Sequence, residues 1–201
     1  MGDREEAELR ALLEARDLAG TATRALALYG PELYGFLINL LGAESDAAEV
    51  FAQLAEDLWR GLGTFGGRCS VRTWMYLLAR HAAARFRRSP WQRATGNSSR
   101  LDSVVAEARS RTQPWLRTDV KDKWRALRES LDPDDRTLLV LRVDRDLDWN
   151  DIALVMLSHD DVADAEVRRE AARLRKRYHL LKDELRERAR AAGLIDTDSD
   201  Q

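Results

Sequence analysis

The sequence is short of the residues on which enzymes and secreted proteins usually depend. Its 201 residues include one cysteine, Cys69, and three histidines that lie far apart, His81, His159 and His179. A lone cysteine provides neither a disulfide framework nor a thiolate metal site, so we expect a reducing compartment and no metal or other cofactor. The sequence also has no phosphate-cradling glycine fingerprint and no nucleophile motif. We therefore expect a protein that is not an enzyme.

Long apolar runs are also missing. No window holds the roughly 18 consecutive apolar residues that a membrane-spanning helix needs. The first ten residues are acidic and polar, unlike a secretory signal. We expect no membrane insertion and a cytoplasmic protein. The composition, 44% hydrophobic and 34% charged, is typical of one or two compact domains.

Acidic residues are absent from the interval between Asp57 and Asp102, although the formal net charge of the chain is −2. Such a segment predicts contact with a polyanion. From Glu129 to Glu166 acidic residues outnumber basic ones, and basic character returns over residues 168–190, where a solvated helix face is an equally good interpretation. The arginines of the acid-free interval are Arg60, Arg68, Arg72, Arg80, Arg85, Arg87, Arg88, Arg93 and Arg100.

The apolar residues recur at spacings of three and four, which predicts an all-α fold. Pro31 predicts a helix that begins there and ends at Gly42. Ser45 and Asp46 predict a second helix that reaches Trp59, and a third is expected from near residue 70 to just before residue 90. Residues 91–118 lose this pattern and contain Gly, Asn, Ser and Pro. The sequence thus predicts two small helical domains joined by a flexible linker.

The second domain contains three helix-start signals, at Asp132, Asp148 and Asp164, because a capping carboxylate accepts hydrogen bonds from free N–H groups. A short helix over residues 149–157, a turn and a long helix after it form a helix-turn-helix pattern, whose second helix can enter the major groove. The apolar stripe expected on the long helix is Val167, Ala171, Leu174, Tyr178, Leu181 and Leu185.

The third helix of the first domain predicts two opposite faces. Arg80 and Arg87 oppose its apolar residues, and Arg72, His81 and Arg88 flank them. One side should pack and the other should contact phosphate. The apolar face consists of Val71, Met75, Leu78, Ala82 and Phe86.

An aromatic and a glycine-rich segment accompany these arginines. Trp74 lies at the edge between the faces, where it is either an ordinary core aromatic or a stacking platform for an unpaired base. Residues 64–68, before it, contain two glycines that allow close approach of a ligand to Phe65. The combination favours single-stranded DNA.

The second helix has an acidic face. Carboxylates repel phosphate, so this face predicts a protein partner with a basic surface, or else a plain solvated face. Its residues are Asp46, Glu49, Gln53 and Glu56.

These segments carry a family resemblance. Residues 29–34, 46–59 and 70–80 resemble region 2 of extracytoplasmic-function sigma factors, and residues 131–177 resemble their region 4. The resemblance implies a sigma factor that directs core RNA polymerase to promoters and aids strand opening. The alternative is a helix-turn-helix regulator that acts without polymerase. The domains implied are an acidic helical extension over 1–24, region 2 over 25–92, a linker over 93–118, region 4 over 119–190 and a disordered tail over 191–201.

The resemblance also implies sites and partners. The partners would be core RNA polymerase, through its clamp helices and flap, and promoter DNA, with an anti-sigma factor as a further candidate. Polymerase would be bound by Asp46, Glu49, Gln53 and Glu56. The −10 element would be bound by Phe65, Arg68, Arg72, Trp74, Arg80, His81, Arg85 and Arg88. The −35 element would be bound by Glu166, Arg168, Arg169, Arg173, Arg175 and Lys176.

The sequence departs from the family pattern at three places. The usual Gln-Glu pair of the polymerase-binding helix is Ala52-Gln53 here, and His81 stands where the family commonly has Asn. The turn of the helix-turn-helix, residues 158–164, is lengthened and acidic. These departures leave the individual polymerase contacts and the −10 base open.

Overall fold

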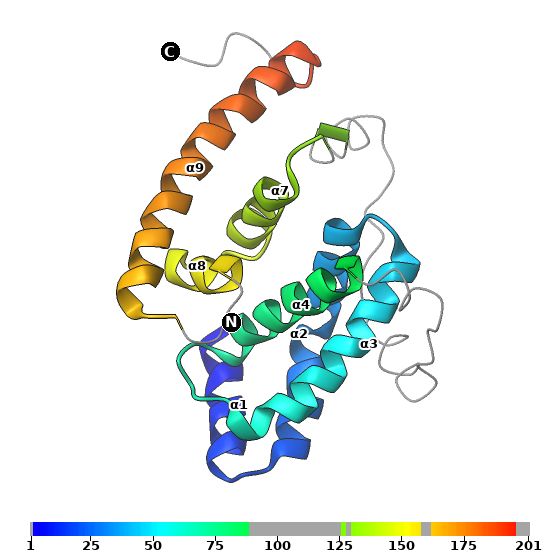
Figure 1. Cartoon of the computed structure of the whole chain (residues 1–201), viewed down its shortest axis with the longest axis vertical. Coiled ribbons are helices and arrows are strands. Elements are labelled where there is room, and N and C mark those ends of the chain that lie inside the picture. Colours follow the sequence, from blue (N-terminus) through cyan, green and yellow to red (C-terminus); the bar gives the residue numbers. More distant parts are fainter. Residues whose placement is uncertain (1, 89–125, 128–129, 158–161, 196–201) are drawn as a thin grey trace. The chain divides into compact units, whose positions relative to one another are not determined.

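The computed structural model describes residues 2–88, 126–127, 130–157 and 162–195. Within these residues the regular structure is helical and contains no strand, which confirms the all-α prediction (Figure 1). The chain divides into two compact units, Met1–Gln113 and Pro114–Gln201. The predicted linker, residues 158–161 of the predicted turn and residues 196–201 of the predicted tail lie outside the described residues.

The first unit is a bundle of four α-helices, α1 (Gly2–Glu14), α2 (Leu18–Leu41), α3 (Glu44–Gly61) and α4 (Val71–Arg88), with a short 3₁₀ turn, η1 (Leu62–Thr64), after α3. Helices α2, α3 and α4 pack against one another, and α1 packs against α2 and α4. Two edge-to-face aromatic pairs tie α2 to its neighbours, Tyr34 with Phe51 at 5.6 Å and Phe36 with Tyr76 at 5.2 Å between ring centroids.

Helix α2 corrects the sequence prediction at Pro31, which lies inside the helix and not at its first position. The helix begins after Asp17, whose side chain accepts a hydrogen bond of 2.8 Å from the backbone N of Gly20. An internal proline costs about 3 kcal/mol or more. Burial on both sides of it, as at Ala25 and Leu33, outweighs that cost. The predicted end at Gly42 is confirmed, with φ at 81° in the left-handed region.

The starts of the next two helices are close to their predicted places. Helix α3 begins at Glu44, one residue before the predicted Ser45, and the preceding Ala43 makes no side-chain cap. The third predicted helix is α4. Ser70 caps it, because Oγ of Ser70 accepts a hydrogen bond of 2.9 Å from the backbone N of Thr73.

The acidic N-terminal segment is a packed part of the first unit. Leu9 of α1 is fully buried. Oε1 of Glu6 accepts a hydrogen bond of 2.7 Å from the backbone N of Val71, at the start of α4. Glu8 pairs with Arg24 of α2 at 2.9 Å. Helix α1 therefore supplies a second cap for α4, where the helix dipole favours a carboxylate.

The second unit contains α7 (Pro133–Leu139), the π-helical segment η3 (Val140–Asp144), α8 (Trp149–Leu157) and α9 (Asp164–Ala191). Helix α9 packs against α7 and α8. The cap predicted at Asp132 is confirmed, since its Oδ1 accepts a hydrogen bond of 2.9 Å from the N of Asp134.

The starts of α8 and α9 differ from that of α7 in how they are capped. Helix α8 follows Asp148 directly, and the carbonyl of Asp148 accepts the first helical hydrogen bond, 2.9 Å from the N of Ile152. Helix α9 begins at Asp164 itself, with Ala163 as a cap residue that lacks a side-chain hydrogen bond. The cap predicted at Asp164 is therefore wrong by one residue. Val162 and Val167 are both buried at the positions of a hydrophobic staple, which fixes the start instead.

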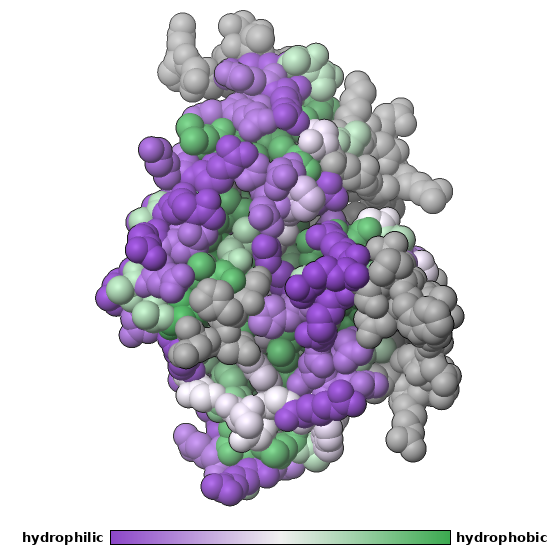
Figure 2. Space-filling view, in the orientation of Figure 1, coloured by the Kyte–Doolittle hydropathy of each residue, from purple (hydrophilic) through white to green (hydrophobic). Residues whose placement is uncertain are grey.

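The predicted apolar stripe of α9 is confirmed. Four of its residues are buried, and Tyr178 and Leu185 pack partly buried against a cluster of Leu131, Leu139 and Leu181. Hydrophilic side chains cover most of the molecular face in Figure 2, with hydrophobic ones scattered between them. Among the described helices, none combines the length and the apolar character needed to cross a bilayer.

Candidate nucleic-acid interface and protein-docking surface

Helix α4 is buried on more sides than its sequence predicts. Of the predicted apolar face, Val71, Met75, Ala82 and Phe86 are buried, but Leu78 is only half-buried. The helix also buries residues outside that face: Thr73, Tyr76, Leu77, Ala79 and Ala83. The reason is that α1, α2 and α3 all pack on this helix. The prediction of one packed side and one opposite phosphate-seeking side is therefore wrong, and a narrower surface remains accessible.

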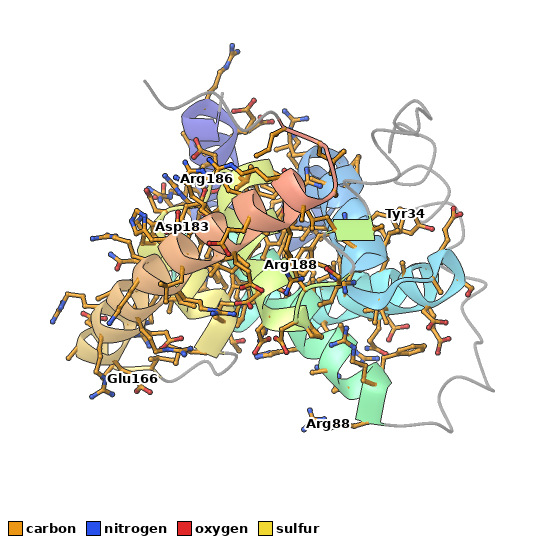
Figure 3. All side chains as sticks on the ribbon, turned by 90° about the horizontal axis from the view of Figure 1, so that it is seen from above. Tyr34, Arg88, Glu166, Asp183, Arg186 and Arg188 are labelled. Carbon is orange, nitrogen blue, oxygen red and sulfur yellow. The ribbon has the colours of Figure 1, made fainter. Side chains whose placement is uncertain are left out.

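Part of that accessible surface is a strip formed by Trp74, His81, Arg85 and Arg88, which we call the α4 strip. These residues recur at spacings of seven, four and three, so they share one face of the helix. Arg87 is exposed on another side of the helix. Arg85 and Arg88 are exposed, and Trp74 and His81 are half-buried. Arg88 lies at the end of the α4 ribbon (Figure 3). Four of the predicted −10 residues therefore form one surface.

Arg72 and Arg80 lie outside the strip. Nε and Nη2 of Arg72 donate hydrogen bonds of 2.7 and 2.9 Å to the two carboxylate oxygens of Glu32 in α2. Burial lowers the pKa of Arg72, but the hydrogen bonds with Glu32 outweigh it, so the net pKa is raised. Arg72 is thus engaged inside the domain, where it joins α2 to α4. Arg80 is half-buried, about a third of a turn from the strip.

The glycine-rich loop brings a second aromatic to Trp74. The ring centroids of Phe65 and Trp74 lie 4.8 Å apart with an interplanar angle of 33°. Trp74 also lies over Gly61, where an added Cβ would come within 2.9 Å of Cζ2 of the indole. Trp74 is therefore partly packed against the loop and partly accessible beside Phe65. Arg68 of the same loop is exposed.

The acidic face of α3 lies on the accessible side of that helix. We call it the acidic stripe, and it consists of Asp46, Glu49, Gln53 and Glu56. Glu56 is exposed and the other three are half-buried. Burial, followed by the charge of Asp46, raises the pKa of Glu49. Glu56 pairs with Arg60 at 3.3 Å, and the neighbouring Trp59 is 56% exposed. The stripe can thus offer negative charge and one aromatic to a partner.

In the second unit the predicted −35 residues follow the first half of α9. Glu166 is half-buried at the start of the helix (Figure 3). The five basic residues are exposed. Arg173 makes hydrogen bonds of 2.7 and 2.6 Å to the carboxylate of Glu170. The guanidinium of Arg175 lies over the Trp149 ring, 5.6 Å from its centroid. The basic residues form a cationic surface that flanks and opposes the buried stripe of α9.

A family model for sigma-70 region 2 matches residues 26–93, which run from within α2 to beyond α4. These residues therefore carry a sigma-70 region 2 domain. It is similar to the RNA polymerase sigma-H factor of Pseudomonas aeruginosa, with 27% identity over 136 residues, 64% of this chain and 70% of that protein. No solved structure matches significantly. The resemblance to region 2 is confirmed, and both the α4 strip and the acidic stripe lie within the matched segment.

Three contacts around these surfaces were not predicted from the sequence. Asp57 of the sigma-70 region 2 segment bonds to Gln53 and Arg85. Its spacing of four from Gln53 could have indicated the first contact, but the second joins residues on different helices. The guanidinium of Arg142 lies over the Trp149 ring, 5.2 Å from its centroid, in addition to that of Arg175. The residues described include no group of histidine, cysteine or acidic side chains that could hold a metal ion.

Proposed function

We propose that this protein is a sigma factor of the extracytoplasmic-function type, which directs bacterial core RNA polymerase to promoters with −10 and −35 elements. The observation that carries the proposal is the placement of two unlike surfaces on adjacent helices of the sigma-70 region 2 segment. The α4 strip joins cations to the Phe65 and Trp74 rings, and the acidic stripe lies on α3. One surface suits DNA and the other suits a basic protein.

The α4 strip and the loop before it are proposed to hold the opened −10 element. Cations follow the backbone of a single strand, and aromatic rings accept an unstacked base. We assign backbone contacts to Arg68, Arg85 and Arg88 and base contacts to Trp74 and His81. Arg80 would extend this surface. Arg72, which is bonded to Glu32, would instead hold α4 in place on α2.

The first half of α9 is proposed to read the −35 element as duplex. Arg168 and Arg169 lie in its first turns, where side chains reach base edges in the major groove. Arg173, Arg175 and Lys176 would contact phosphates, which position a protein without reading sequence. Glu166, at the start of the helix, would accept from a base amino group.

The acidic stripe is proposed to dock on the clamp helices of polymerase, and the second unit on its flap. A basic partner surface complements the charge of the stripe. Catalysis would then belong to polymerase, and the protein would act in the cytoplasm. The second candidate, a regulator that binds promoters without polymerase, is favoured by the cationic surface of α9 alone and leaves the acidic stripe without a role.

Run-off transcription with purified bacterial core polymerase on a genomic promoter library tests the proposal. We expect start sites that share two upstream elements. A variant with Glu49→Lys and Glu56→Lys should lose binding to core polymerase and initiation. Glu56 is exposed, where substitutions change stability by about ±0.5 kcal/mol, and circular dichroism checks the fold because Glu49 is half-buried. Specific binding to duplex promoters without polymerase, together with no initiation in its presence, would favour the regulator.

A further inference from the structure

One carboxylate touches both of the surfaces described above. Oδ1 of Asp57 in α3 accepts a hydrogen bond of 3.0 Å from Nε2 of Gln53, a residue of the acidic stripe. Oδ2 of Asp57 accepts a hydrogen bond from Nη2 of Arg85, a residue of the α4 strip. Asp57 therefore connects a residue proposed to contact polymerase with one proposed to contact DNA.

The exposure of the two side chains allows a phosphate to compete with Asp57 for the guanidinium of Arg85. The side chain of Asp57 is 19% exposed and that of Arg85 is 45% exposed. A half-buried carboxylate attracts its partner more strongly than one in bulk water does, since the surroundings screen less. Arg85 is still accessible to a phosphate, but the phosphate must compete with Asp57 for the guanidinium.

Two other ion pairs of these helices do not join the two surfaces. Glu56 and Arg60 pair within α3, one turn apart. Arg72 and Glu32 join α4 to α2, and both side chains are largely buried. Asp57 and Arg85 link α3 to α4 at their accessible edges.

We propose that Asp57 is a positioning residue that withholds Arg85 from DNA until a cationic surface docks on the acidic stripe. Gln53 and Asp57 are one helical turn apart, so a basic side chain that reaches the stripe also reaches this carboxylate. Sharing the carboxylate weakens its hold on Arg85 and leaves the guanidinium for a phosphate oxygen. The inference rests on the proposed function, because it takes the α4 strip to bind DNA and the stripe to bind a basic partner.

The test measures DNA binding by the full chain without polymerase. A fluorescently labelled single-stranded oligonucleotide of mixed sequence is titrated, and anisotropy gives the affinity between about 50 and 200 mM salt. Asp57→Asn should make one more cation available to the strand, which steepens the plot of log affinity against log salt by about 0.7. Affinity over that range then falls by a further factor of about 2 to 3.

A double-mutant cycle shows whether Arg85 is the released cation. The steeper slope should vanish when Asp57→Asn is combined with Arg85→Ala. Glu49→Gln is the matched control, because it removes the same charge from α3, and any gain it gives should be equal with and without Arg85.

Two results would overturn the inference: a slope unchanged by Asp57→Asn, or a steeper slope that survives in the double variant. If Arg85→Ala weakens DNA binding by the polymerase complex while Asp57→Asn has no effect on the free chain, only the role of Asp57 fails. If Arg85→Ala has no effect on either the free chain or the polymerase complex, the assignment of the α4 strip to DNA fails with it.

Discussion

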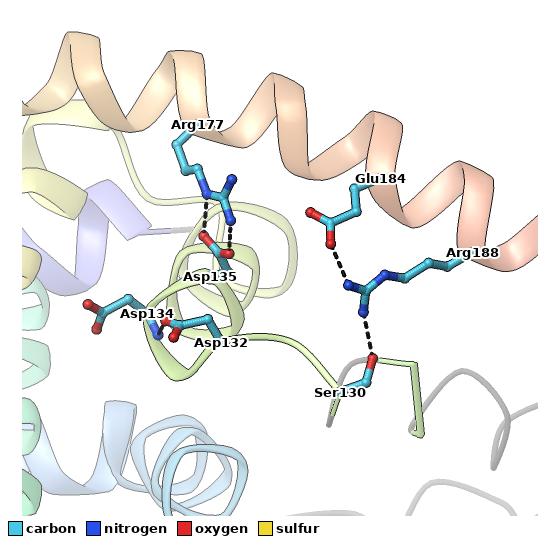
Figure 4. Close-up of polar contacts among 7 residues, drawn as sticks. All are labelled: Ser130, Asp132, Asp134, Asp135, Arg177, Glu184 and Arg188. Atoms are coloured by element: carbon cyan, nitrogen blue, oxygen red, sulfur yellow. Dashed lines mark hydrogen bonds and ion pairs between the residues drawn. The ribbon is translucent and has the colours of Figure 1, made fainter.

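Arg177 of α9 makes a bidentate ion pair with Asp135 of α7 (Figure 4). Nε of Arg177 donates a hydrogen bond of 2.8 Å to Oδ1 of Asp135, and Nη2 donates to Oδ2. These hydrogen bonds raise the pKa of Arg177. Further along α9, Arg188 bonds to Glu184 and to Ser130 (Figure 4). Arg177 and Arg188 therefore tie α9 to α7 and to Ser130 before it.

Loss of the ion pair between Arg177 and Asp135 should destabilise the second unit. Asp135 is 7% exposed, so Asp135→Ala leaves a guanidinium without its bidentate partner beside buried residues. We expect the free energy of unfolding to fall by about 1–2 kcal/mol, because hydrogen bonds to charged groups contribute about 1.5–3 kcal/mol and the 43% exposure of the Arg177 side chain reduces that contribution. Urea denaturation followed by circular dichroism measures it. Asp134→Ala, at an exposed neighbouring position, is the control and should stay within about 0.5 kcal/mol of the parent.

Tyr29 should make stability depend on alkaline pH. Burial, followed by the charge of Glu6, raises its pKa from 10.0 to about 12. Unfolding exposes the phenol, which then loses its proton at a lower pH than in the folded state. Stability is therefore full below about pH 10 and is lost as the pH rises toward 12, by about 2–3 kcal/mol. Denaturation midpoints across this window measure the loss. The difference in stability between the parent and Tyr29→Phe isolates the contribution of this phenol. Parallel curves of stability against pH for the two proteins would contradict the prediction.

Sequence patterns predicted the fold best where the deciding signals are local. The boundaries of α8 follow from Asp148 and the run after it, and the buried stripe of α9 follows from its spacing. Arg72 shows where such reasoning fails. Its bidentate partner, Glu32, lies on another helix, and the spacing of α4 alone placed Arg72 beside the phosphate-seeking face. A helix pattern reveals which residues share a face but not how many neighbours will cover that face.

Pro31 tests how far packing outweighs local sequence preference, because the helix continues through a proline that was predicted to begin it. Pro31→Ala restores a backbone N–H inside α2 and should raise the free energy of unfolding by about 2–2.6 kcal/mol. This is the helix gain of about 3 kcal/mol less about 0.4–1 kcal/mol for the added freedom of the unfolded chain. Chemical denaturation measures it. Pro133→Ala is the matched control, since Pro133 occupies the first position of α7, where the N–H has no helical partner. Equal effects at both positions would contradict the prediction.

The α4 strip should decide whether a promoter opens. A base stacked on an aromatic is worth about 1–3 kcal/mol by alanine substitution, similar to the few kcal/mol needed to extrude one. Trp74→Ala and Arg88→Ala complexes with core polymerase should therefore still bind duplex promoters through α9 but open them about tenfold less or worse. Permanganate reactivity of unpaired thymines measures opening, and a template mismatched across the −10 region should restore much of it.

Two controls make this result specific to the strip. Trp74 packs on Phe65 and lies over Gly61, so the Trp74→Ala chain must first show a parental circular dichroism spectrum and melting curve. Arg186→Ala removes an equally charged side chain from α9 that pairs with Asp183 within its own helix, and it should leave opening unchanged (Figure 3). Because Arg88 is exposed at the end of α4, its removal should not unfold the domain. Parental permanganate reactivity in a folded Arg88→Ala complex would mean that this end of the strip does not hold the melted strand. The same result for a folded Trp74→Ala complex would remove base stacking from the mechanism.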